Sequence, residues 1–203
     1  MKTKTGTIAI VALLGANFAT AAEPSPQKTE YFIRPLAAYV SPTDGDSATA
    51  FGFAAGGSFG SRKEHEVSFE WNSARWDKPV TDPDFSATAS LKLMPYLLSY
   101  RYYFGNEALK ARFYIGASAG MSSMDVSINA VTAGETFSGG DRAWGSTLVG
   151  TAGVKFRLTE KADLDIGYRY QQINGPTLTI EGESIELDDL KANILYLGVG
   201  FRF

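Results

Sequence analysis

The sequence closes on Asn193-Ile194-Leu195-Tyr196-Leu197-Gly198-Val199-Gly200-Phe201-Arg202-Phe203, and this stretch decides the fold. Alternate side chains of a β-strand point to opposite faces, so positions two apart share a face. One face of this strand is entirely hydrocarbon and aromatic; it carries Leu195, Leu197, Val199, Phe201 and Phe203. The other face holds small residues, a tyrosine and an arginine. A strand this apolar at the edge of a soluble sheet would aggregate unless something covered it, and lipid is the simplest cover.

The composition excludes several classes of protein. The chain has 203 residues, a net charge of −3 and no cysteine. Without a basic stripe, a nucleic-acid partner is not expected. Without cysteine, disulfides, thiolate metal sites and a cysteine nucleophile are ruled out.

The amino-terminal residues predict a secretory signal peptide over 1–22. Lys2 and Lys4 supply the positive start, residues 8–18 are apolar, and small residues at 19–22 offer a cleavage site. No other stretch reaches the roughly 18 apolar residues of a spanning helix. Residues 23–203 are then expected to form one exported domain.

Eight stretches of this domain alternate in the same way as the closing strand. They are 31–40, 51–60, 66–71, 93–104, 112–121, 144–157, 163–170 and 193–203. Their connections are alternately long (41–50, 72–87, 122–142 and 171–192) and short (61–64, 105–110 and 159–161). This asymmetry is typical of outer-membrane barrels. We therefore predict an all-β fold, an eight-stranded antiparallel up-and-down transmembrane β-barrel whose lumen is just wide enough for side chains.

Details of the long connections are also predicted. Pro79 and Pro83 are expected to interrupt any strand in 72–87. Residues 126–137 have a pattern that could continue as a ribbon, and a hairpin is expected around Glu181-Gly182-Glu183.

Several strand motifs resemble those of the outer-membrane β-barrel superfamily. They are Leu98-Ser99-Tyr100-Arg101-Tyr102-Tyr103-Phe104, the segments 114–120 and 152–158, Gly167-Tyr168-Arg169-Tyr170, and the closing strand. This superfamily holds the OmpA membrane domain, OmpW-like and opacity-type proteins. The resemblance implies a porin-like, OmpA-like barrel in the outer membrane of a Gram-negative cell envelope, in contact with outer-membrane lipid and lipopolysaccharide.

The closing strand also resembles the strand that the barrel assembly machinery recognises by its final phenylalanine. The resemblance makes the outward face of this strand the expected assembly signal: Leu195, Leu197, Val199, Phe201 and Phe203. A Phe203→Asp variant should then be exported normally but reach the outer membrane at a reduced level, which membrane fractionation would measure.

Catalysis is not expected. Some barrels of this size modify lipid A, and such enzymes need a histidine near a serine and a carboxylate. The single histidine, His65, starts the third strand at the short-turn end, between Glu64 and Glu66, whereas such an enzyme would place its base at the opposite rim. We predict no catalytic residue, no cofactor and no metal.

Charged side chains on the inward faces form the main candidate site. The set is Arg34, Glu66, Glu70, Arg101, Arg112, Lys155, Arg157, Asp163, Asp165, Arg169 and Arg202. Charges inside a narrow barrel must be paired or hydrated. The favoured interpretation is an ionic network that fills the lumen, and the alternative is a narrow gated solute path with a basic mouth.

Three pairs are expected within this network. The third and seventh strands lie opposite each other in an eight-stranded barrel, so Glu70 and Arg169 should meet across the lumen. The minimal turn at 159–161 should set Arg157 against Asp163 and Lys155 against Asp165 as cross-strand neighbours.

These observations favour a structural or surface-interaction role, with adhesin-like loops that bind a host or surface ligand. A narrow small-solute channel is the alternative, and a lipid-A-modifying enzyme is less favoured. The acidic residues of the last loop, Glu181, Glu183, Glu186, Asp188 and Asp189, could hold a divalent cation, but a solvated acidic face is the favoured interpretation.

Overall fold

The computed structural model describes residues 29–82, 85–132, 135–175, 177–180, 183–186 and 188–203. The expected signal peptide lies outside the described residues. The strands are β1 (Glu30–Pro42), β2 (Ala48–Phe59), β3 (His65–Asp82), β4 (Phe85–Tyr103), β5 (Ala111–Thr132), β6 (Glu135–Arg157), β7 (Ala162–Ile173), β8 (Thr177–Ile180), β9 (Glu183–Glu186) and β10 (Leu190–Arg202). Within these residues, no helix has the length and apolarity that crossing a membrane requires.

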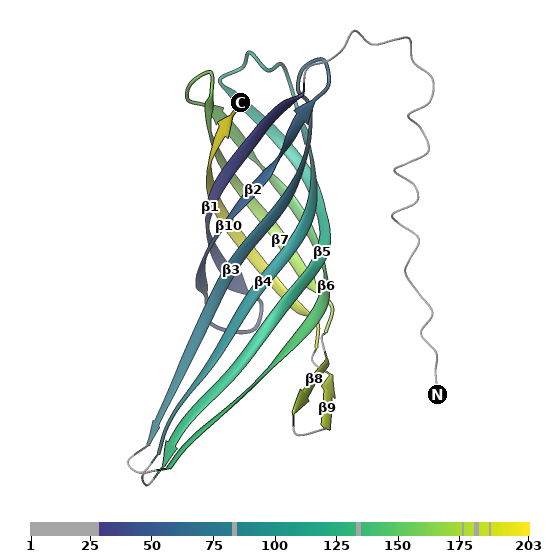
Figure 1. Ribbon diagram of the computed structural model, residues 1–203. Helices are drawn as coiled ribbons and strands as arrows, with labels where there is room; N and C mark the ends of the chain where they lie inside the picture. The colour runs from purple at the N-terminus through teal and green to yellow at the C-terminus, as the bar shows by residue number, and fades with distance from the viewer. Residues whose placement is uncertain (1–28, 83–84, 133–134, 176, 181–182, 187) are drawn as a thin grey trace, which may run out of the picture.

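Eight of the strands close into a barrel. The order around it is β1-β10-β7-β6-β5-β4-β3-β2, and every neighbouring pair is antiparallel (Figure 1). The seam between the first and last strands continues to Phe203, whose backbone N–H donates to the carbonyl of Tyr31 at 3.0 Å. The predicted fold is therefore confirmed. The predicted hairpin of the last loop is also present as the pair β8–β9.

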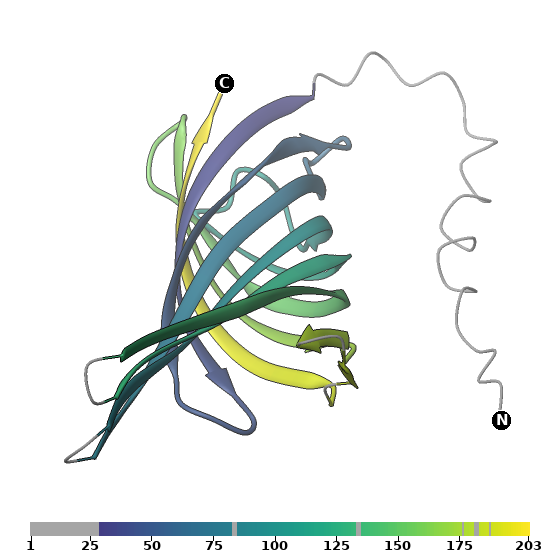
Figure 2. The same cartoon turned by 60° about the horizontal axis from the view of Figure 1, so that its bottom comes forward.

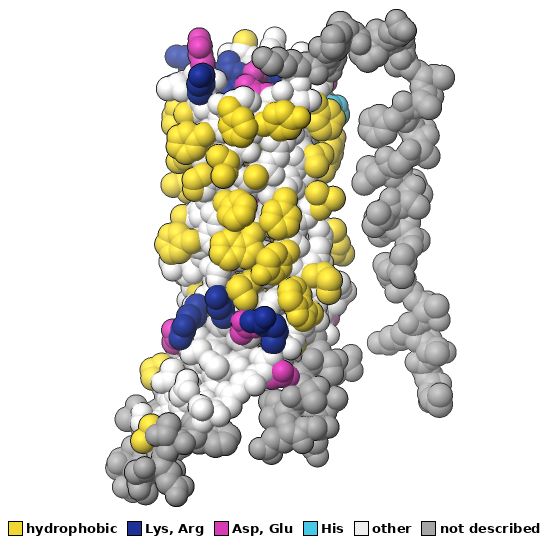
Figure 3. All heavy atoms as spheres, viewed as in Figure 1, with side chains coloured by type: hydrophobic (Ala, Val, Ile, Leu, Met, Phe, Trp, Pro, Cys, Tyr) yellow, Lys and Arg dark blue, Asp and Glu magenta, His cyan; other side chains and the backbone are white. Residues whose placement is uncertain are grey.

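The alternation of the sequence determines which side chains face lipid. Along β10, Leu195, Leu197 and Phe201 are exposed on the outer wall, whereas Ile194 and Tyr196 are buried inside. The same alternation in the other barrel strands produces a band of hydrophobic side chains, bounded at both ends by charged ones (Figure 3). A band of this kind is what the hydrocarbon core of a membrane requires.

Two predicted loops are strands instead. Most of 72–87 and of 122–142 belongs to paired strands that extend past the barrel as two hairpins, which we call the ribbons and which pair with each other through β4 and β5 (Figure 2). The pairing of β2 with β3 ends at Ala50 opposite Ala74, so beyond that point β3 is an edge strand and tolerates Pro79. The prediction that Pro79 interrupts the ladder was wrong, because Pro79 is paired with Thr88 in this edge strand, whereas Pro83 lies outside the described residues.

A close backbone approach makes Gly120 sensitive to substitution. A Cβ atom at this position of β5 would overlap the carbonyl oxygen of Tyr96 on the neighbouring β4. We expect Gly120→Ala to destabilise the barrel by about 1–3 kcal/mol, as overpacking typically does.

The matched control is Gly150→Ala, because a Cβ atom there has no neighbour within 4 Å. Urea unfolding in lipid vesicles should show a lower midpoint for Gly120→Ala alone. Equal midpoints for the two variants would contradict the close approach at Gly120.

Candidate functional site in the barrel lumen

The middle of the lumen is occupied by eight ionised side chains of the described residues, which we call the ionic layer. Four are cationic and four are anionic: Arg34, Arg101, Lys155 and Arg169 with Glu66, Glu70, Asp163 and Asp165. They come from β1, β3, β4, β6 and β7, and the alternation of each strand turns them inward. A balanced set of this kind satisfies the requirement that buried charge be paired.

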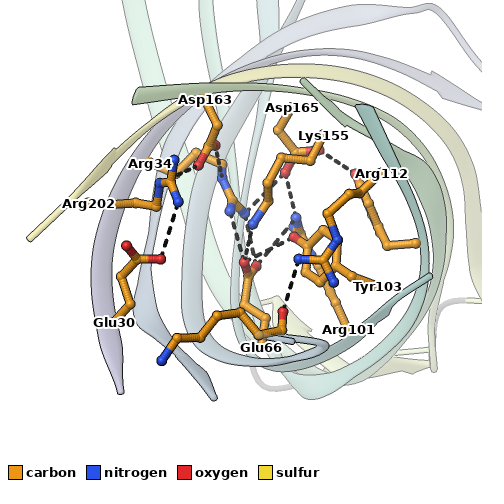
Figure 4. Close-up of polar contacts among 12 residues, drawn as sticks. Glu30, Arg34, Glu66, Arg101, Tyr103, Arg112, Lys155, Asp163, Asp165 and Arg202 are labelled. Atoms are coloured by element: carbon orange, nitrogen blue, oxygen red, sulfur yellow. Dashed lines mark hydrogen bonds and ion pairs between the residues drawn. The ribbon is translucent and has the colours of Figure 1, made fainter. Parts of the chain in front are cut away.

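Glu66 accepts the largest number of contacts in this layer. Its carboxylate oxygens accept hydrogen bonds from Arg34 at 3.1 and 3.0 Å and from Nζ of Lys155 at 2.8 Å. The hydroxyl of Tyr103 donates at 3.0 Å, and Nη1 of Arg101 lies 3.7 Å away (Figure 4). A single carboxylate from β3 thus joins side chains of β1, β4 and β6.

Asp165 is the second centre of the layer. Nη1 of Arg101 donates to its Oδ2 at 2.6 Å, and Nη1 of Arg34 lies 3.1 Å from the same atom. The hydroxyl of Tyr114 donates to Oδ1 and also contacts the hydroxyl of Tyr196. These tyrosines come from β5 and β10, so the polar contacts of the layer extend around the barrel.

The Glu70–Arg169 contact expected across the lumen is present in the structure. Nη2 of Arg169 lies 2.6 Å from Oε2 of Glu70, as an ion pair without an aligned hydrogen bond. Glu70 also accepts a hydrogen bond from Nη2 of Arg101 at 2.8 Å. The guanidinium of Arg169 lies over the ring of Tyr196, 4.2 Å from its centroid.

The two cross-strand pairs have the expected register but different ion-pair partners. Lys155 is opposite Asp165, and Arg157 is opposite Asp163. Asp165 is already engaged by two arginines, and the long chain of Lys155 reaches across the lumen to Glu66 instead. Arg157 pairs with Glu107 at 3.1 Å, because that carboxylate lies on the turn at the same end of the barrel.

The remaining predicted cations lie at the short-turn end. Arg202 pairs with Glu30 at 3.3 Å and with Glu107 at 3.6 Å. Arg112 donates to the carbonyl of Lys63 at 3.2 Å and stacks over Tyr103. The alternation of the strands places Tyr103, Tyr114 and Tyr196 on the inward faces, where the structure has them. Glu30 and Glu107 lie outside the stretches that the alternation assigns to strands, so the sequence did not indicate these two carboxylates.

His65 lies away from the ionic layer. Its Nδ1 is 2.8 Å from the hydroxyl oxygen of Tyr100, and its ring packs among Phe59, Tyr100 and Tyr102 on the outer wall. No group of acidic or histidine residues within the described part of the chain could hold a metal ion. Of the acidic residues of the last loop, Glu183 and Glu186 belong to β9, and Glu181 lies outside the described residues. Asp189 accepts hydrogen bonds from Gln172 and from the backbone N–H of Gly175.

A closed antiparallel barrel with an outward apolar band and a lumen filled by ion pairs defines an integral outer-membrane β-barrel protein. The family model of the outer membrane protein beta-barrel domain matches residues 9–203, and the chain belongs to this family. Its location is therefore the bacterial outer membrane, where such barrels contact lipid and lipopolysaccharide.

Solved proteins of similar fold come from Neisseria, Yersinia and Thermus. Neisserial surface protein A is 18% identical, with a TM-score of 0.54, and the match covers 88% of this chain and 100% of that chain. Ail, the attachment invasion locus protein of Yersinia pestis, solved with the heparin analogue sucrose octasulfate, is 17% identical, with a TM-score of 0.50 and coverage of 86% and 98%. A major outer membrane protein of Thermus thermophilus is 11% identical, with a TM-score of 0.52 and coverage of 87% and 100%. At these identities the likeness concerns the fold. A comparison with curated proteins finds no match.

Proposed function

We propose that this barrel is a non-catalytic surface protein whose ribbons beyond the membrane serve in attachment. The observation that carries the proposal is the extension of β3 to β6 past the barrel as one continuous paired sheet. The β3–β4 ladder continues to Asp82 opposite Phe85, the β4–β5 ladder to Phe85 opposite Thr132, and the β5–β6 ladder to Thr132 opposite Glu135. A paired sheet presents its side chains in fixed positions, which suits it to recognition.

The ionic layer supports a binding role over a channel. Arg34, Glu66 and Asp165 are fully buried at the centre of the lumen and contact one another or shared partners. A solute would have to break these ion pairs to pass, and removing one partner of a buried pair is costly. The attachment function that names Ail is consistent with the same use of this fold.

The position of His65 supports a non-catalytic role. It is the only histidine of the sequence and packs against tyrosine and phenylalanine rings on the outer wall. A hydroxyl nucleophile needs an adjacent base, and the hydroxyl in contact with His65 is the phenol of Tyr100. Lipid A of cells that overexpress the protein should keep its mass, and a changed mass spectrum would favour an enzyme.

The attachment role is tested by trimming both ribbons. Residues 76–91 and 126–141 are each replaced by Asn-Gly, a dipeptide that forms tight hairpin turns between paired strands. The joints are Arg75 with Lys92 and Asp125 with Arg142, which are opposite each other in the sheet. Bacteria that display the intact protein should adhere to epithelial monolayers several-fold more than vector controls, and the trimmed variant should lose this gain.

The matched control removes the β8–β9 hairpin, residues 176–187, and should keep the adherence. Equal adherence of the trimmed and intact proteins would overturn the attachment role. Planar-bilayer recordings of the intact protein should show no discrete conductance steps, and their appearance would favour the narrow channel. The role of the outward face of β10 as the assembly signal stays a prediction.

A further inference from the structure

The inward face of the barrel changes polarity along its length. In the middle it carries the ionic layer, but toward the ribbons apolar residues form two buried clusters: Val40, Ala50, Ala74 and Ile194, and Leu93, Met124 and Ile173. Buried polar residues such as Thr147 and Gln171 lie beside them. The interior of outer-membrane barrels is usually polar. An apolar interior at the end that leads to water therefore calls for a physical explanation.

A cavity lies between these clusters. Its volume is about 620 Å³, and its wall includes Val40, Ala48, Leu93, Met124 and Ile173. This volume falls in the range of about 300–1,000 Å³ that is typical of sites for small molecules. The wall also includes polar residues such as Ser90 and Gln171, so the cavity joins an apolar surface to a polar one. We call this cavity the outer cup.

Trp76 forms one side of the outer cup. It packs against both apolar clusters, and its indole N–H donates to the backbone carbonyl of Asp46 at 2.7 Å. This hydrogen bond ties the connection between β1 and β2 to the wall of the cup. The indole is therefore a built-in reporter of anything that enters.

The rim of the outer cup carries both signs of charge, in equal number among the described residues. Its cations are Arg75, Lys78 and Lys191, and its carboxylates are Asp44, Asp46 and Asp77. Asp77 accepts hydrogen bonds from Ser90 at 2.5 Å and from Arg75 at 2.9 Å, and both contacts lower the pKa of its carboxyl group. A rim of this composition complements a head group that itself carries both charges.

The floor separates the outer cup from the ionic layer. The gap bounded by Val40, Ala50, Arg169 and Tyr196 has a volume of about 10 Å³. This is no more than the space of a single water molecule. An occupant of the cup therefore stops above the ion pair between Arg169 and Glu70.

From this geometry we propose that the outer cup binds a single-chain zwitterionic amphiphile. The alkyl chain occupies the apolar cavity, and the head group lies at the rim beside Arg75, Lys78 and Asp77. The aliphatic wall favours an alkyl chain, because the only aromatic ring among its described residues is that of Trp76. The proposal does not rest on the attachment role, but the trimmed variant also removes Trp76, Lys78 and Leu91 from the wall of the cup, so the binding test uses the untrimmed chain.

The test uses tryptophan fluorescence in phosphatidylcholine nanodiscs. Trp71→Phe with Trp144→Phe leaves Trp76 as the sole tryptophan of three. A companion variant, Trp76→Phe, keeps the two tryptophans of the outer wall. The probe is a lysophosphatidylcholine with a dibrominated acyl chain, since bromine quenches indole fluorescence on contact. Quenching of Trp76 should saturate at a probe concentration at least ten-fold lower than the quenching of the companion.

Competition between the brominated probe and unbrominated amphiphiles identifies the head group that the site prefers. The same lysolipid without bromine should restore Trp76 fluorescence, and a sodium alkyl sulfate of equal chain length should do so at least ten-fold less effectively. Quenching of Trp76 that rises in parallel with the companion would overturn the site, because it would reflect partition into the bilayer. Equal competition by the sulfate would overturn the assignment of a zwitterionic head group.

A filled cup supplies the matched control. Ala48 is buried opposite Val40 and lines the cavity, so Ala48→Phe in the Trp76-only chain should remove the saturable quenching. Ala37→Phe adds the same ring on the exposed outer face of β1 and should leave the quenching unchanged. If both variants keep the saturable component, the probe binds elsewhere. The competition measurement uses an unfilled cup and decides the proposal even where Ala48→Phe does not refold.

Discussion

Glu66→Gln should lower the free energy of unfolding of the barrel by about 3–5 kcal/mol, the usual consequence of removing one partner from a buried ion pair. The substitution keeps the size of the side chain but removes its charge. Arg34, Lys155 and Arg101 then remain buried with fewer anions, because Glu66 is within 4.0 Å of all three cations. Urea unfolding in phospholipid vesicles, monitored by tryptophan fluorescence, measures the decrease in the free energy of unfolding.

Glu107→Gln is the matched control for this change. Glu107 also pairs with two arginines, but its side chain is 35% exposed at the short-turn end. Water screens such pairs, and they typically contribute up to about 1 kcal/mol. If the two variants lost equal stability, the ionic layer would not behave as a buried network.

Glu70→Ala and Arg169→Ala should each destabilise the barrel, and the double variant should lose less than the sum of the two. Each single change leaves a buried charge without its partner, whereas the double change removes both charges. A coupling energy of about 0.5–3 kcal/mol is expected for residues in direct contact. Thermal and urea unfolding of the three variants supply the cycle.

A second cycle with Glu107→Ala and Arg169→Ala provides the comparison and should be additive, because Glu107 pairs with Arg157 and Arg202. Additivity in the Glu70 cycle would show that the contact with Arg169 contributes no coupling. Planar-bilayer recording adds a separate readout. A stable conductance in Glu70→Ala alone would identify the ionic layer as a gate and favour the channel.

Much of the fold was predictable because one physical rule governs each membrane-spanning segment. Lipid on one side and a narrow lumen on the other force strict alternation, and strands such as 163–170 therefore show their inward residues directly. Because the third and seventh strands lie opposite each other, the contact between Glu70 and Arg169 was also predictable, and the structure contains it.

The rest of the site depends on distances that alternation does not encode. The alternation of β6 places Lys155 in the lumen, opposite Asp165. It does not show that Lys155 forms its ion pair with Glu66 instead. The ribbon over 126–137 was predicted and is present in β5 and β6, but the one over 72–87 was missed because a sheet solvated on both faces loses its apolar period. The outer cup was missed because its wall combines residues from the ribbon end of several strands. The sequence of each of these strands shows no unusual pattern by itself.

The ionic layer also constrains the order in which the barrel can form. Glu66 on β3 joins Arg34, 32 residues before it, to Lys155, 89 residues after it, and the Arg202–Glu30 pair spans 172 residues. None of these bonds can form in a lone hairpin, so their charges stay hydrated until distant segments meet. Because non-local contacts slow folding, closure of the ring is expected to be late and cooperative. Desolvation of the lumen and completion of the β1–β10 seam then occur together. A half-closed barrel is therefore stabilised little by its ion pairs or by the backbone hydrogen bonds of the seam.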